Sequence, residues 1–244
     1  MSTVTSIQHL KPPVPADQFE YKRLKQGEFW RHIPAYAEID EATFLDHLWQ
    51  QRQSVKTAEE LLQTIRGVCT AEFYRDAESG NLPEVSFVRP YEPYSGHPGN
   101  SAVSAYEYFV LSIANEIISK PDLFATAAIV ITFDEGGGYY DSGYIQPLDF
   151  FGDGTRIPML VISPYTKPGS IDHAYSDHGS VLKFIEKNWR LKPLSPRSRD
   201  NMPNPIASRN DPYVPTNGPA ISDLMSVFDF SQRRKPVLII PGGI

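Results

Sequence analysis

The feature that most constrains the fold is a seven-residue apolar run, AAIVITF at residues 127–133, which leads into two acids and three glycines. A short run rich in β-branched residues is typical of a strand buried on both faces, as in the parallel sheet of an α/β protein. Such sheets carry their chemistry at the carboxyl ends of strands, where Asp134 and Glu135 stand. The glycines at 136–138 permit a positive φ and a close backbone approach to a ligand. The segment therefore predicts a functional site.

Other predicted strands and helices alternate along the chain. Residues 85–88 and 156–164 predict strands, and residues 104–120 and 176–189 predict amphipathic helices. This alternation favours an α/β fold with a mainly parallel sheet flanked by helices. Beyond Trp189 prolines dominate and no long periodic segment follows, so we expect that part to lie over the domain rather than to form a second one.

The chain divides into three predicted parts. Residues 1–72 are an irregular, proline-containing entry segment with two short predicted helices, at residues 41–51 and 57–67. Residues 73–230 are the α/β domain, and residues 231–244 are a tail.

Composition and charge narrow the class of partner. The net charge of -6 and the pI near 5.5 disfavour nucleic acid or an anionic membrane as the main partner, because both require a basic patch. Cys69 is the only cysteine, which excludes an intramolecular disulfide and a thiolate metal cluster. No apolar stretch approaches the ~18 residues of a membrane span, and no signal-peptide pattern is present, so we do not expect an integral membrane protein. The cellular location stays open.

Several motifs stand in a fixed order: FYRDAESGNLPEVSFVRP, SGHPGNSA, IVITFDEGGGYYD, RIPMLVISPYTKPGSIDHAYSDHGSVLKFIEKNW and DLMSVFDF. Over residues 73–230 this order resembles the C-terminal half of the phosphoesterase family of bacterial phospholipases C and acid phosphatases, whose members are often exported. The family is a branch of the alkaline-phosphatase-like superfamily. The resemblance implies an alkaline-phosphatase-like fold, a phosphate-ester substrate such as a phospholipid headgroup, and hydrolysis at a metal centre by a Ser or Thr nucleophile.

The resemblance also implies roles for individual residues. Asp134 and Glu135 match acids that bind the metal, and His97 in HPG matches a histidine that assists the leaving group. His178, in SDHGS, is a further candidate for a place in the site. A cation is needed because the phosphate ester is anionic and more charge develops on its oxygens during attack. Carboxylates fit a divalent ion such as Ca, Mn, Fe or Zn, and the sequence leaves the choice open.

Each candidate also has a purely structural interpretation. Asp134 and Glu135 would then stabilise a turn by accepting backbone N–H bonds, and His97 would be an exposed loop residue. His178 would pack beside Asp177, which we expect to be the N-cap of the following helix. In the functional interpretation, the two acids converge on one ion and His97 lies in the same cleft.

Two departures from the family pattern limit what the resemblance implies. Members usually carry a histidine after the Tyr-Asp that follows the glycines, but here Asp141 is followed by Ser142. The sequence contains no Glu-Asn dipeptide, the family's N-terminal metal motif, and its first ~70 residues lack a unit that could present the nucleophile. We therefore expect the C-terminal portion of a larger enzyme, whose N-terminal half is missing or separately encoded.

Two other functions are compatible with these residues. The first is a catalytically inactive remnant that still binds metal or a phosphate ester. The second is a different hydrolase with Ser163 or Ser180 as nucleophile, which is disfavoured because neither serine lies in a G-x-S-x-G elbow.

Overall fold

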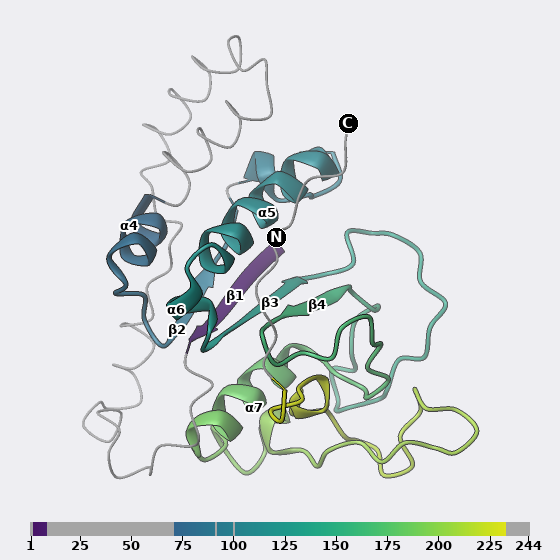
Figure 1. The fold of residues 1–244 in the computed structure, drawn as a ribbon. Coiled ribbons are helices and arrows are strands. Elements are labelled where there is room, and N and C mark those ends of the chain that lie inside the picture. Colours follow the sequence, from purple (N-terminus) through teal and green to yellow (C-terminus); the bar gives the residue numbers. More distant parts are fainter. Residues whose placement is uncertain (1, 9–70, 91, 100, 233–244) are drawn as a thin grey trace.

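The computed structural model describes residues 2–8, 71–90, 92–99 and 101–232 (Figure 1). The helices predicted at residues 41–51 and 57–67 lie outside the described residues. None of the helices in the described ranges is both long and apolar enough to cross a bilayer.

The described sheet has four strands in the order β2-β1-β3-β4. Their bounds are β1 Ser2–Gln8, β2 Val85–Val88, β3 Ala127–Phe133 and β4 Met159–Ile162. The strands predicted at 85–88 and 127–133 are thus confirmed, and β1 is an addition to them. The buried strand predicted within 156–164 is present only over 159–162, and its residues are partly exposed because β4 is an edge strand of the described sheet.

The prediction of a mainly parallel sheet is wrong for the described strands, because every neighbouring pair is antiparallel. Thr5 of β1 pairs with Phe87 on one side and Val130 on the other, and Val130 in turn pairs with Val161. The physical reason is that β1, purple in Figure 1, occupies the place between β2 and β3. Both of these strands run opposite to β1, so they run in the same direction without being neighbours. The alkaline-phosphatase-like fold stays a prediction.

Helices join and cover the strands. Their bounds are α4 Ala71–Ser79, α5 Val103–Ile118, α6 Pro121–Phe124 and α7 His178–Trp189. The chain passes from β2 through α5 and α6 to β3, which confirms the helix predicted between these strands. In this crossover, helices bridge two strands of like direction, as in a βαβ unit, with β1 inserted between them.

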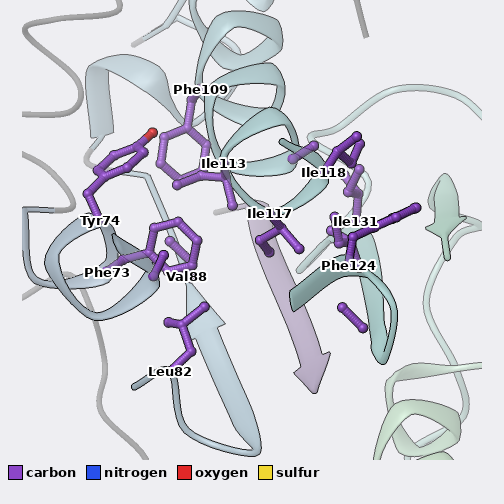
Figure 2. Close-up of a cluster of buried hydrophobic side chains, with 14 of the residues drawn as sticks. Phe73, Tyr74, Leu82, Val88, Phe109, Ile113, Ile117, Ile118, Phe124 and Ile131 are labelled. Carbon is purple, nitrogen blue, oxygen red and sulfur yellow. The ribbon is translucent and has the colours of Figure 1, made fainter. Parts of the chain in front are cut away.

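The two faces of β3 bury different hydrophobic clusters. Ala127, Ile129 and Ile131 face a cluster formed mainly by α4 and α5, including Phe73 and Phe109, which Figure 2 shows. Ala128 and Val130 belong to a second cluster with side chains of α7 and of the segment after it. Six of the seven residues of β3 are buried. The prediction of a strand buried on both faces is confirmed. Because β3 is held in the core, it fixes the position of Asp134 and Glu135, which follow it.

The segment after α7 packs over that second cluster. Among residues 190–232 the structure has only two short 3-10 helices, η4 Arg199–Asn201 and η5 Met225–Val227. The ring of Phe228 stacks on Phe184 of α7 at 5.1 Å between centroids. Burying these rings attaches the segment to the domain, while the domain boundaries at residues 72 and 230 stay a prediction.

A buried amide also holds this segment in place. The side chain of Gln146 is 2% exposed, donates to the carbonyl of Ala220 at 2.8 Å and accepts from its N–H at 2.8 Å. Its backbone N–H donates to the Tyr175 hydroxyl at 2.9 Å. The loop after β3, the strand-to-helix connection before α7 and the late segment are therefore joined at one point.

Candidate functional site

A cleft of about 1110 Å³ opens where β3 ends, and Asp134, Glu135 and His178 all line it. The burial of β3 explains the position of the acids: Ile131 is 5% exposed, whereas Asp134 and Glu135 are exposed. Further walls come from β4 and from residues 153–157 and 166–178. Three of the four candidate site residues are thus brought to one cleft, although His178 lies more than forty positions after the acids in the sequence.

One wall of the cleft ends at the start of α7. Asp177 caps the helix, because its Oδ1 accepts from the Ser180 N–H at 3.2 Å and the Ser180 hydroxyl accepts from the Asp177 N–H at 3.2 Å. This reciprocal capping box confirms the predicted N-cap. It fixes the orientation of the next residue, His178.

His178 connects α7 to the end of β3. Its Nε2 lies 2.8 Å from the carbonyl oxygen of Phe133, the residue just before Asp134. A carbonyl can only accept a hydrogen bond, so Nε2 carries the proton and, in the neutral ring, Nδ1 is the acceptor. His178 therefore holds the backbone from which Asp134 projects, and its part in any chemistry stays a prediction.

Glycine is required in the turn after the acids, at some positions because of the backbone conformation and at another because a side chain would not fit. Gly137 and Gly138 have φ of +65° and +75°, which few other residues adopt. A Cβ at Gly136 would lie 2.4 Å from Oγ1 of Thr155, so a side chain there would collide with Thr155, which also lines the cleft.

Glu135 takes part in this turn, since its Oε2 accepts from the Gly137 N–H at 2.7 Å. That bond is the one the structural interpretation predicts. A carboxylate has two oxygens and several acceptor positions, so the bond is compatible with a cation on the same group. The convergence of Glu135 and Asp134 on one ion stays a prediction.

His97 lies on a neighbouring loop. A Cβ at Gly137 would be 3.3 Å from two ring carbons of Pro98, which places the HPG segment against the glycine turn. His97 itself is exposed, and its Nδ1 is 2.8 Å from the Pro98 carbonyl oxygen. It is not among the described residues that line the cleft, so its catalytic role stays a prediction.

An ionic cluster that the sequence did not predict surrounds Arg199 of η4. The guanidinium donates to Asp149 through Nε at 2.8 Å and to Asp177 through Nη1 at 3.1 Å, and lies 3.5 Å from Asp153. Its hydrogen bond to Asp149 raises the pKa of Arg199 and lowers the pKa of Asp149. The cluster holds the capped end of α7 against residues 149–153. The three carboxylates lie 22 to 50 positions before Arg199 in the sequence, so no local pattern joins them to it.

A second ion pair closes the loop between the glycine turn and the cleft wall. Asp141 accepts from Arg156 Nη2 at 2.6 Å and Nε at 2.9 Å, and from the backbone N–H groups of Arg156 and Gly143. These bonds, with the Arg156 side chain contributing most, hold the pKa of Asp141 well below its usual range. Asp141 therefore has a structural partner here, at the position where the family pattern has Tyr-Asp-His.

The residues present fit a divalent cation in kind. Asp134 and Glu135 offer carboxylate oxygens, which hard cations prefer. Within the described ranges, no group of three or more His, Cys, Asp or Glu side chains is arranged to hold a metal. An ion at the two acids would therefore take its other ligands from water, from a substrate phosphate or from residues outside the described ones.

Comparison with known proteins identifies the family. The model of the phosphoesterase family matches residues 24–192, so the chain belongs to that family, and the predicted resemblance is confirmed. The match begins earlier than the quoted motifs and ends near the end of α7.

Individual relatives are phospholipases C. The chain is 30% identical to the non-hemolytic phospholipase C of Burkholderia pseudomallei over 183 residues, which are 64% of this chain and 24% of the relative. It is 26% identical to phospholipase C B of Mycobacterium tuberculosis (strain H37Rv) over 192 residues, 68% of the chain and 33% of the relative. It is also 26% identical to non-specific phospholipase C1 of Arabidopsis thaliana over 207 residues, 72% of the chain and 36% of the relative. The chain thus spans between a quarter and about a third of the length of these relatives.

Proposed function

We propose that this chain takes part in metal-dependent hydrolysis of phosphate esters, of the phospholipase C or acid phosphatase type. Membership of the phosphoesterase family and the names of the relatives support the class of reaction. The observation that carries the proposal is that Asp134 and Glu135 stand together at the end of the central strand, in a cleft of about 1110 Å³. A cleft of this size accommodates a small substrate or the headgroup of a larger one.

The acids are the proposed metal ligands. A divalent cation bound to Asp134 and Glu135 supplies positive charge for the phosphoryl oxygens. The Glu135 bond to the Gly137 N–H and the His178 bond to the Phe133 carbonyl hold the backbone on both sides of the two acids. This restraint reduces the conformational freedom that would otherwise be lost when a ligand binds.

His97 is the proposed proton donor to the departing alkoxide. A histidine can donate a proton near neutral pH, and the HPG segment packs against the glycine turn beside the acids. The Ser or Thr nucleophile and the remaining metal ligands are proposed to come from outside the described residues, in the same chain or in a separately encoded one.

A second candidate is a catalytically inactive protein that binds a metal or a phosphate ester. The absence of a three-ligand group among the described side chains favours it, because two carboxylates hold a hard cation only weakly. The two candidates share the ligands and differ in turnover.

One experiment separates them. Mn²⁺ binding is measured by titration calorimetry, and hydrolysis of p-nitrophenyl phosphate and bis(p-nitrophenyl) phosphate is measured with the metal present. The variant is the double substitution Asp134→Asn/Glu135→Gln, and the matched control is Asp122→Asn, an exposed carboxylate in the first turn of α6.

Binding and turnover that are both lost in the double variant and kept in the control support the hydrolase. Binding lost in the double variant, with no turnover by the unaltered chain either alone or with a separately produced N-terminal half, supports the inactive binder. Binding that the double variant retains contradicts both candidates.

A further inference from the structure

Two adjacent phenylalanines project from the loop that borders the cleft. Phe150 is 95% exposed and Phe151 is 90% exposed, whereas Phe73, Phe109 and Phe184 of the two hydrophobic clusters are fully buried. The rings of the pair contact each other edge to face, with centroids 5.4 Å apart. Large aromatic side chains are seldom left so exposed, and an exposed pair indicates an interaction surface.

The turn that carries the pair is held firmly. The Asp149 side chain accepts from the Phe151 N–H at 2.8 Å, and the Gly152 N–H donates to the Asp149 carbonyl at 3.0 Å. Arg199 donates hydrogen bonds to the Asp149 carboxylate and to the Gly152 carbonyl, and so joins the residue before the pair to the residue after it. The pair is therefore exposed on a turn that several hydrogen bonds hold in one conformation.

The pair stands at the rim of the candidate site. Residues 153–156, which begin two positions after Phe151, line the cleft. Asp153 also accepts from the Tyr175 hydroxyl at 2.8 Å, which ties this stretch to the connection before α7. Tyr139 and Tyr140, 67% and 92% exposed, lie at the other end of the same loop. Exposed aromatic rings thus occur at both ends of the segment that passes from the glycine turn to the cleft wall.

We propose that Phe150 and Phe151 insert into the interface of a zwitterionic phospholipid surface and hold the cleft against it. The part of this inference that names the substrate class, an ester presented by a lipid surface, rests on the proposed function. The insertion itself does not depend on turnover.

The area of the pair favours lipid over a protein partner. A stable protein interface buries about 800 Å² on each side. Two aromatic side chains offer about 150–250 Å² each, which is too little for a dimer but suited to insertion between lipid headgroups.

The local charge selects the kind of lipid. Asp149 and Asp153 flank the pair, Arg199 is shared among three carboxylates, and the chain carries a net charge of -6. An anionic surface would repel this region, so a phosphatidylcholine surface is the expected partner.

Flotation of the whole chain with phosphatidylcholine vesicles, in EDTA and without any substrate assay, tests the proposal. We expect the unaltered chain to bind and each single substitution, Phe150→Ser or Phe151→Ser, to weaken the partition coefficient about tenfold. The matched control is Ile206→Ser, which removes another exposed apolar side chain (60% exposed) and should bind as the unaltered chain does. Vesicles rich in phosphatidylserine should not bind more tightly.

A second readout measures insertion directly. In Phe151→Trp, the added tryptophan emission, taken as the difference from the unaltered chain with its three tryptophans, should be quenched by phosphatidylcholine brominated in its acyl chains. The control Ile206→Trp should not be quenched.

Failure of the unaltered chain to bind phosphatidylcholine, or equal binding by the serine variants, would overturn the proposal. Concentration-dependent self-association that both serine variants abolish would assign the pair to a second copy of this chain, and would also overturn it. Vesicle binding without hydrolysis would leave this inference standing. Absence of hydrolysis even when a separately produced N-terminal half is added would refute the proposed hydrolase, so the two failures are distinguishable.

Discussion

Gln146→Leu should destabilise the protein strongly, because this amide satisfies two backbone groups in the interior. Gln146 and Ala220 are 2% and 0% exposed, and the two hydrogen bonds between them are both 2.8 Å long. Leucine has a similar volume but leaves the N–H and the carbonyl of Ala220 without this partner. An unsatisfied buried polar group costs about 1–3 kcal/mol, so the N–H and the carbonyl of Ala220 together cost about twice that. The apolar surface that leucine buries offsets part of this cost. We expect a net loss of about 3 kcal/mol in the free energy of unfolding.

The assay is urea denaturation followed by far-ultraviolet circular dichroism, in which this loss lowers the midpoint by about 1 M or more. Gln146→Glu provides the internal control, because a carboxylate can accept from the Ala220 N–H but cannot donate to its carbonyl. Burial opposite a carbonyl raises the folded-state pKa of the new Glu, so its neutral form is favoured in the folded protein. The variant should therefore be closest to the unaltered protein at low pH and lose stability as the pH rises. A loss below about 0.5 kcal/mol for Gln146→Leu would refute the reasoning, and so would a pH-independent Gln146→Glu.

Two further predictions concern packing and protonation. Gly136→Ala should lower the free energy of unfolding by about 1 kcal/mol, since its Cβ would meet Thr155 Oγ1 at 2.4 Å. Thr155→Ala in the same chain should restore the loss, and Gly154→Ala, whose Cβ meets nothing within 4 Å, should cost nothing; equal losses for the two glycine variants would contradict the collision. Burial, assisted by a hydrogen bond with Asp200, raises the pKa of Glu186 to about 8. The stability of the unaltered protein relative to Glu186→Gln should therefore be highest below pH 4.5 and fall as the pH rises to about 8, whereas a constant difference in melting temperature would show that folding does not raise the pKa of Glu186.

What could be predicted from the sequence is what lies within one continuous segment. The strand at 127–133, the acids that follow it and the N-cap at Asp177 all depend on neighbours in the sequence, and the structure contains each of them. Burial on both faces of β3 followed from its uninterrupted apolar composition.

What could not be predicted depends on distant partners. The segment Ser2–Gln8 is rich in β-branched residues but has only two apolar ones, Val4 and Ile7, which do not alternate. Its ladder partners lie about 80 to 130 positions later in the sequence, in β2 and β3. If β1 is not recognised, the helical crossover from β2 to β3 indicates that these two strands are adjacent and parallel, which is the prediction that proved wrong. Likewise, Arg199 gave no signal, because an arginine near proline and serine residues is ordinary until the fold brings three carboxylates to it. The cleft is therefore predictable at its acidic end and unpredictable along its other walls.

The most direct test of the proposed site is an anomalous-difference map from a crystal of this chain soaked in MnCl₂. We expect a peak within about 2.0–2.6 Å of carboxylate oxygens of both Asp134 and Glu135, and its loss in the Asp134→Asn/Glu135→Gln variant. A well-ordered cleft with no peak there, or a peak held by other side chains while Glu135 remains only a turn-forming residue, would contradict the claim that these two acids bind the metal.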